Sequence, residues 1–273
     1  IGFSAFEHAQ IGFETWMGGF DCVKDDENLT STKFNNFYKR VQLLAKMRDK
    51  AEKITGEKKS YLINVSAGTT EEMLRRAKFV AREGGEYAMI DIITSGWTAL
   101  ASLRNACKDL GLAIHAHRAM HGAFTRNPYQ GISMALVGKI SRLLGVDQLH
   151  VGTAGVGKLV GGKEEVLEIQ QHVTFTSGKD SNHVHSSKKH VKENQRLHCL
   201  YQDWHGKRAV FPVSSGGLHP ILIPVVLERL GDNIMLQIGG GIHGHPQGSP
   251  ALREMLAEYL GRARGVTTDP AHI

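Results

Sequence analysis

The sequence predicts an α/β fold of the (β/α)8 TIM-barrel class, in which parallel strands and helices alternate along the chain. Three observations support this prediction. Short, continuous apolar runs, typical of strands covered on both faces, alternate with longer segments of helical periodicity. This alternation yields seven predicted strands. The length of 273 residues suits a single barrel domain.

The elements follow from local signals. Ser4 and Glu7 form a capping box that begins the first helix, and Gly18 and Gly19 end it before a strand at residues 20–23. The remaining strands are expected at residues 61–65, 87–93, 112–117, 148–151, 209–213 and 234–238. The remaining helices are expected at residues 30–55, from 70 onward, and at 97–110, 131–144, 164–171, 219–230 and 249–264.

A barrel of this class needs eight strands, and the first predicted element here is a helix. We therefore expect the first barrel strand to be missing and to belong before Ile1. Residues 1–273 are interpreted as one catalytic barrel domain truncated at both ends. Residues 172–207, rich in His, Lys and Ser, are expected to form a surface excursion within it.

Composition narrows the class of protein. A hydrophobic content of 41% and a charged content of 22% are those of an ordinary globular protein, and no apolar run is long enough to span a membrane. Three scattered cysteines and no signal peptide favour a reducing, cytoplasmic location. The net charge of +6 fits a small anionic substrate, and we find no spacing typical of nucleic-acid binding. We expect neither a nucleic-acid partner nor a membrane.

The first predicted strand ends in a lysine followed by three acids. Lys24, Asp26 and Glu27 place one amine and two carboxylates around one point, and oxygen ligands of this kind suit Mg²⁺. A protonated amine would repel the cation, whereas an amine joined to CO₂ as a carbamate would be a third anionic ligand. In the alternative interpretation, residues 25–27 cap a helix beginning near Thr30 and Lys24 is a solvated neighbour.

Polar residues also follow the other predicted strands, where barrels of this class build their active sites. They are Asn64, Asp91, His115 to His121, His150 to Lys158, Ser215 to Gly217, and Gln237 to Gly241. His117 is a candidate acid/base, whereas His115 is more simply a structural histidine. Arg118 either grips a phosphate or pairs with a neighbouring acid.

Three glycine-rich segments follow the later strands. Residues 152–159 fail as a nucleotide-binding P-loop because Leu159 stands where a Ser or Thr should follow the lysine, and they are interpreted as a lid that carries Lys158. Residues 214–217 and 239–241 are either simple turns or a phosphate site built from backbone amides. With Arg118 and His150 offering a second phosphate seat, a bisphosphate substrate is indicated.

Taken together, the motifs at residues 18–28, 117–121, 152–159, 214–219 and 239–246 resemble the large subunit of ribulose-1,5-bisphosphate carboxylase/oxygenase (RuBisCO). The resemblance covers nearly the whole chain, and residues 125–128 with the lid are most similar to the archaeal, form III type. It implies a Mg²⁺-dependent lyase that carboxylates, and also oxygenates with O₂, ribulose 1,5-bisphosphate through an enediolate. The products of carboxylation would be two 3-phosphoglycerates, made in nucleotide and ribose salvage by a homodimer or larger homo-oligomer.

The resemblance also implies residue roles. Lys24 matches the lysine carbamylated by CO₂, with Asp26 and Glu27 as the other Mg²⁺ ligands. His117 matches a catalytic acid/base and Lys158 the lid lysine that stabilises the carboxylation transition state. The residues matched to substrate binding are Arg118, His150, Lys158, Ser215, Gly216, Gly217, Gln237, Gly239 and Gly240.

The sequence also departs from this family. An amino-terminal domain and the first strand with its lysine acid/base have no match, Val160 replaces a lid glutamate, and Ile242 and His243 replace Thr-Leu. Residues 248–252 look shortened, and residues 181–195 are unlike the family's usual form. Two alternatives therefore remain, a RuBisCO-like enolase or isomerase of another sugar phosphate and a non-catalytic fragment that needs a partner chain. We expect the isolated chain to be inactive.

Overall fold

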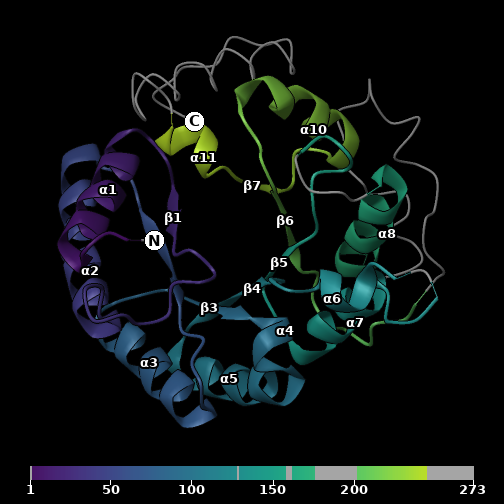
Figure 1. Ribbon diagram of the computed structural model, residues 1–273, viewed down its shortest axis with the longest axis horizontal. Coiled ribbons are helices and arrows are strands. Elements are labelled where there is room, and N and C mark those ends of the chain that lie inside the picture. The colour runs from purple at the N-terminus through teal and green to yellow at the C-terminus, as the bar shows by residue number, and fades with distance from the viewer. Residues whose placement is uncertain (1, 128, 158–161, 176–201, 245–273) are drawn as a thin grey trace. The chain divides into compact units, whose positions relative to one another are not determined.

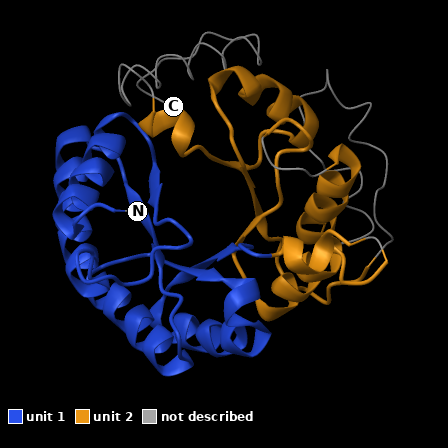
Figure 2. Cartoon of the chain, in the orientation of Figure 1, with its two compact units in different colours: residues 1–120 blue, residues 121–273 orange. Residues whose placement is uncertain are grey.

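The computed structural model describes residues 2–127, 129–157, 162–175 and 202–244 (Figure 1). Within it the chain forms two compact units, residues 1–120 and residues 121–273 (Figure 2). Each unit consists of parallel strands joined by helices, which confirms the predicted α/β class. The predicted helix at residues 249–264 lies outside the described residues.

Unit 1 contains four strands that pair in chain order, namely β1 (Cys22–Lys24), β2 (Ser60–Asn64), β3 (Tyr87–Asp91) and β4 (Ala113–His117). All three pairings are parallel. Because they are parallel, the carboxyl ends of the strands share one edge of the sheet. That edge carries Lys24, Asn64, Asp91 and His117, each the last residue of its strand.

The long helices of unit 1 lie along one face of these strands (Figure 1). They are α1 (Ala5–Met17), α2 (Phe37–Thr55), α3 (Thr70–Arg82) and α5 (Trp97–Leu110), and the short helix α4 (Ile92–Ser95) follows β3. The predicted capping box at Ser4 and Glu7 is present at the start of α1. Each helix buries a stripe at three- to four-residue spacing, as Val41 and Leu44 do in α2, and these stripes form the core of the unit.

Unit 2 contains three parallel strands, β5 (Gln148–His150), β6 (Phe211–Ser215) and β7 (Met235–Gln237), which pair in that order. Its helices are α6 (Gly122–Thr125), α7 (Met134–Leu144), α8 (Lys163–Thr174), the 3-10 turn η2 (Pro220–Leu222), α10 (Ile223–Leu230) and α11 (Gly240–His243). α8 therefore includes the first three residues of the predicted excursion at 172–207, and His172 and Val173 are buried in it.

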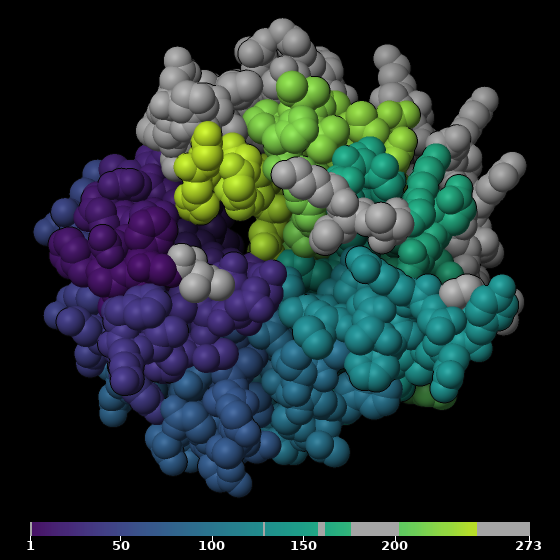
Figure 3. Space-filling view, viewed as in Figure 1, coloured from purple at the N-terminus to yellow at the C-terminus, as the bar shows by residue number. Residues whose placement is uncertain are grey.

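One predicted helix begins too early. The helix expected at residues 30–55 starts only at Phe37, with Asn36 as its N-cap. Residues 30–36 form an irregular segment in which Phe34 is 52% exposed, and the start of the chain beside it lies at the surface (Figure 3). Among the described residues, no helix combines the length and the apolar composition that crossing a membrane requires.

Candidate active site

The end of β1 places Lys24 in a largely enclosed position. Its side chain is 8% exposed, and its Nζ atom donates hydrogen bonds to the carbonyl oxygen of Asp25 at 2.6 Å and to Glu27 Oε2 at 3.4 Å. The same Nζ lies 3.8 Å from the sulfur of Met89 on β3. The solvated lysine of the alternative interpretation is therefore excluded, because this amine points into a cluster of acceptors.

His117, the last residue of β4, joins this cluster. Its Nε2 lies 3.6 Å from Glu27 Oε2, and its Nδ1 lies 3.2 Å from Oδ1 of Asp91 at the end of β3. Asp91 is buried, with 5% of its side chain exposed, and it fixes the orientation of the imidazole ring. The preceding His115 is fully buried, in agreement with a structural histidine.

The charge balance of the cluster favours an ionised Glu27. Partial burial raises the pKa of this carboxyl, but His117 and Lys24 outweigh burial and hold the pKa below its ordinary value. An anionic oxygen is thus kept beside the Lys24 amine at neutral pH.

Asp25 has a different position from the helix cap that the alternative interpretation assigned to it. It is fully buried, and its Oδ2 lies 3.3 Å from Nη2 of Arg40, which is fully buried in α2. Burial raises the pKa of Asp25, but Arg40, helped by His8 and Tyr61, lowers it below its ordinary value. The capping hypothesis is therefore wrong for Asp25, which pairs with a cation fifteen residues away.

Asn64 is a second residue whose role the sequence did not assign. From the end of β2, its side-chain Nδ2 donates to the carbonyl oxygens of Glu27 at 3.0 Å and Asp26 at 3.4 Å, and to Asp91 Oδ2 at 3.4 Å. Its only sequence signal was its place at a strand end. Asn64 ties the chain after β1 to the end of β3.

Asp26 is the most exposed of the three predicted metal ligands. Its Oδ1 accepts hydrogen bonds from the backbone and side-chain nitrogens of Asn28, at 2.8 and 3.1 Å. Within the described ranges, no set of three or more His, Cys, Asp or Glu side chains is arranged to hold a metal ion. Two carboxylates and an amine at this edge therefore need a further anionic group before they match the oxygen ligands that Mg²⁺ prefers.

In unit 2, His150 and Ser215 lie together at the ends of β5 and β6. His150 is 2% exposed, and its Nδ1 lies 2.6 Å from Ser215 Oγ. At the end of β7, the Oε1 atom of Gln237 is buried and accepts no hydrogen bond from the described residues. An unpaired buried acceptor of this kind suits a site whose polar partner is a ligand or water.

The glycines around these strand ends permit close backbone packing. A Cβ atom on Gly157 would lie 2.0 Å from the carbonyl oxygen of Gly216, and one on Gly241 would lie 2.7 Å from that of Leu218. Gly216 and Gly217 have φ values of 128° and 71°, which favour glycine. Gly239 caps α11, and Gly240 is the first residue of that helix.

The remaining positions singled out in the sequence are Arg118, Lys158 and Val160. Arg118 follows His117 directly and is half-buried. Lys158 and Val160 lie outside the described residues.

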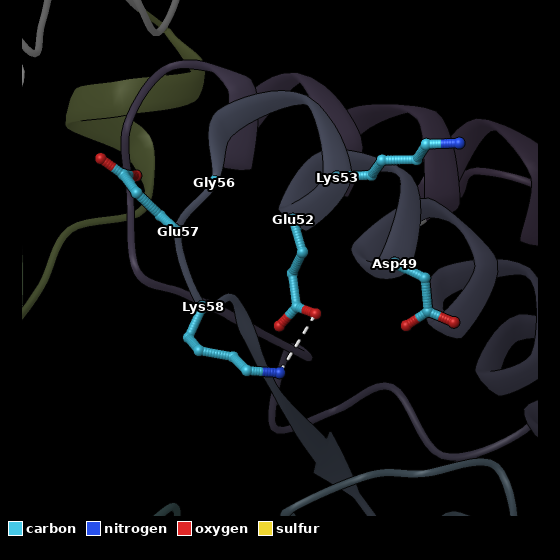
Figure 4. A pocket seen from close by; sticks show the side chains of 6 residues that line it. All are labelled: Asp49, Glu52, Lys53, Gly56, Glu57 and Lys58. Carbon is cyan, nitrogen blue, oxygen red and sulfur yellow. Dashed lines mark hydrogen bonds and ion pairs between the residues drawn. The ribbon is translucent and has the colours of Figure 1, made fainter.

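A hollow of about 390 Å³ lies at the amino end of β2, between the end of α2 and the following loop (Figure 4). Its charged lining includes the Lys58–Glu52 ion pair and none of the predicted site residues.

Comparison with known proteins identifies the family. The model of the ribulose bisphosphate carboxylase large chain, catalytic domain, matches residues 1–256. The ribulose bisphosphate carboxylase of Methanosarcina acetivorans is 49% identical over 251 residues, which cover 92% of this chain and 55% of that protein. The Pyrococcus horikoshii enzyme of the same name is 45% identical over 270 residues, which cover 98% of this chain and 56% of that protein.

Solved structures of archaeal enzymes also match this chain. The octameric ribulose-1,5-bisphosphate carboxylase/oxygenase of P. horikoshii matches with a TM-score of 0.82 and 44% identity, over 97% of this chain and 57% of that one. The dimeric archaeal enzyme of Hyperthermus butylicus matches with a TM-score of 0.82 and 40% identity, over 97% of this chain and 58% of that one. The chain thus spans little more than half the length of these relatives, and it belongs to the ribulose bisphosphate carboxylase large-chain family, within the catalytic domain.

Proposed function

We propose that this chain is the catalytic portion of a Mg²⁺-dependent carboxylase that converts ribulose 1,5-bisphosphate and CO₂ into two 3-phosphoglycerates, with O₂ as a competing substrate. The observation that carries the proposal is the enclosed Lys24 amine, which contacts Glu27 at the edge where His117 and Asp91 also lie. Family membership supports this reaction, and the cluster contains chemical groups that the reaction would use.

Lys24 would become a ligand by reacting with CO₂. The ammonium first loses one proton, and the neutral amine then attacks the carbon of CO₂. A C–N bond forms as one C=O π bond breaks, and a second proton leaves the nitrogen, so that a cation is replaced by a carbamate anion. Asp26, Glu27 and this carbamate would then offer three anionic oxygen ligands to Mg²⁺. The donor set fits, because both carboxylates follow Lys24 within three residues and Glu27 already contacts its Nζ.

When bound, Mg²⁺ would polarise the substrate carbonyl and stabilise the negative charge that develops beside it. His117 would move a proton at Nε2, because Asp91 holds the opposite ring nitrogen. Asn64 would keep the backbone of residues 26 and 27 in place. His117, Asp91 and Asn64 all belong to unit 1.

We propose that Arg118 binds a phosphate group of the substrate, and that polar groups at the strand ends of unit 2 have substrate-binding roles of their own. His150 would bind a phosphate group, and Ser215 would bind the sugar. The amides of Gly216, Gly217, Gly239 and Gly240 would bind the substrate and its phosphate. Gln237 would contribute its unpaired Oε1 as a hydrogen-bond acceptor. Lys158 would stabilise the new carboxylate. A role in nucleotide and ribose salvage, and assembly into a homo-oligomer, stay predictions from the likeness to archaeal relatives.

The test uses the complete protein that carries this chain. We expect preincubation with CO₂ and Mg²⁺ to activate the incorporation of labelled CO₂ into 3-phosphoglycerate, and Lys24→Ala to abolish that activation because the carbamate cannot form. Lys58→Ala is the matched control, since the Lys58 side chain is 88% exposed at the surface. Unchanged activity in Lys24→Ala contradicts the assignment, and turnover of a different sugar phosphate alone would favour the enolase or isomerase alternative.

A further inference from the structure

Asp25 lies between two proposed metal ligands, yet its own carboxylate is fully engaged elsewhere. Its Oδ1 accepts a hydrogen bond from the hydroxyl of Tyr61 and lies 3.2 Å from His8 Nε2. Its Oδ2 accepts from Arg40 Nη2 at 3.3 Å and from the backbone N–H of Asn64 at 3.1 Å. One carboxylate thus joins α1, the end of β1, α2 and β2.

Because the Asp25–Arg40 ion pair is buried, its stability depends closely on its hydrogen-bond geometry. Asp25 and Arg40 are both 0% exposed, and a buried ion pair offsets its desolvation cost only when further hydrogen bonds satisfy the charged groups. The two Nη atoms of Arg40 meet this condition by also donating to the carbonyl oxygens of Thr30 and Asn35, whereas its buried Nε has no hydrogen-bond partner among the described residues. A displacement of Asp25 would therefore break several charge-assisted hydrogen bonds at once.

Fixing Asp25 also fixes its neighbours. Its backbone N–H donates to the carbonyl oxygen of Leu62 at 3.0 Å and so extends the β1–β2 ladder by one residue. Successive side chains along an extended strand point to opposite faces, so Asp25, which faces α1 and α2, directs Lys24 to the opposite face. Asn64, whose backbone is held by Asp25, holds in turn the carbonyl oxygens of residues 26 and 27.

We propose that Asp25, held by Tyr61, Arg40 and His8, is the positioning residue of the metal centre: it sets the backbone that carries Lys24, Asp26 and Glu27, without touching the metal or the substrate. This inference rests on the proposed function, because it concerns the same carbamate and Mg²⁺ site. It assigns a role to the one acid of the run at residues 25–27 that the ligand set leaves out.

The test removes a single hydroxyl group. In the complete protein, Tyr61→Phe deletes one hydrogen bond to Asp25. Tyr38→Phe is the matched control, since the Tyr38 hydroxyl donates to Glu72 at 3.0 Å, which links α2 to α3 and does not involve Asp25. The carbamate is followed by its ¹³C NMR signal in ¹³CO₂ as Mg²⁺ is titrated. We expect Tyr61→Phe to raise the Mg²⁺ concentration at half-maximal signal about tenfold or more, and Tyr38→Phe to leave it unchanged.

The outcomes separate the two hypotheses. If the wild-type protein forms no Mg²⁺-dependent carbamate, the proposed function fails and this inference fails with it. If the wild type forms it and Tyr61→Phe lowers only the unfolding temperature, the cluster is merely structural and the inference alone is overturned. Should Tyr61→Phe not fold, His8→Leu carries the same test, because the His8 side chain is 18% exposed, and His8→Gln, which keeps a donor, should restore the wild-type titration.

Discussion

Cys22, at the start of β1, has a thiol that the fold keeps protonated. Burial raises its pKa from an ordinary 9.0 to about 11, Asp21 and Glu86 add to this effect, and Lys59 opposes it. Because the thiolate is the reactive form, we expect iodoacetamide at pH 8 to leave Cys22 unmodified in the native protein and to alkylate it in urea. Mass spectrometry of the peptide that contains Cys22 measures both states.

Labelling of native Cys22 at a rate like that of the unfolded chain would contradict this expectation. The direction of this pKa shift determines how the thiol's contribution to stability changes with pH. The folded state retains the proton that an exposed thiol loses near pH 9, so the contribution of this group to stability is present below pH 9 and is lost as the pH rises toward 11.

The same strand shows what sequence reasoning can find. The pattern of polar strand ends predicted that Lys24, Glu27 and His117 would gather, and the structure brings them together, although their catalytic roles stay predictions. The alternative interpretation gave Asp25 a capping role because an acid shortly before a helix has the local pattern of a cap. Its actual partner, Arg40, is fixed only when α2 packs against the end of β1, and no local signal encodes that contact.

At the scale of elements, Arg142 of α7 braces two segments that are distant in the sequence. Its guanidinium donates to the carbonyl oxygens of His172 in the last turn of α8, of Phe175 just after α8, and of Lys207 and Arg208 before β6. It also lies 4.1 Å from the centroid of the Trp204 ring.

We expect Arg142→Ala to lower the free energy of unfolding by roughly 2–4 kcal/mol, because it removes the donor to one buried and three partly buried carbonyl groups. Urea denaturation measures the change. Arg208→Ala is the control, since the side chain of Arg208 is exposed and only its carbonyl oxygen contacts Arg142. Equal losses in the two variants would show that Arg142 does not brace these segments.

Elements with complete local signals were predicted well. The helix expected at residues 97–110 has those bounds, and the one expected from residue 70 begins there, after the cap at Thr69. Elements that depend on tertiary packing were not. In the irregular segment at residues 30–36, only Phe34 continues the apolar spacing of α2, and the backbone accepts hydrogen bonds from Arg40 at Thr30 and Asn35. The short helices α4, α6 and α11 are too brief for a periodic signal.

At the scale of the whole molecule, the two outermost described strands, β1 and β7, determine where chains could associate. Among the described residues, β1 pairs on one side only, with β2, and β7 pairs on one side only, with β6. An open strand edge exposes unpaired backbone groups and promotes association between chains. The exposed aromatic rings of Phe3, Phe6 and Phe34 at the start of unit 1 add apolar surface to that liability.

These 273 residues expressed alone are therefore expected to carry out no carboxylation, even after incubation with CO₂ and Mg²⁺. The relatives named ribulose bisphosphate carboxylase are longer, and this chain spans only 55% of the M. acetivorans protein. Light scattering after size-exclusion chromatography should first identify a non-aggregated fraction, because an aggregated sample would be inactive for a trivial reason. That fraction is then assayed for labelled 3-phosphoglycerate beside the complete P. horikoshii enzyme. Measurable turnover by the 273 residues would show that unit 1 and unit 2 contain every group that the reaction requires, which would also remove the need for a partner chain.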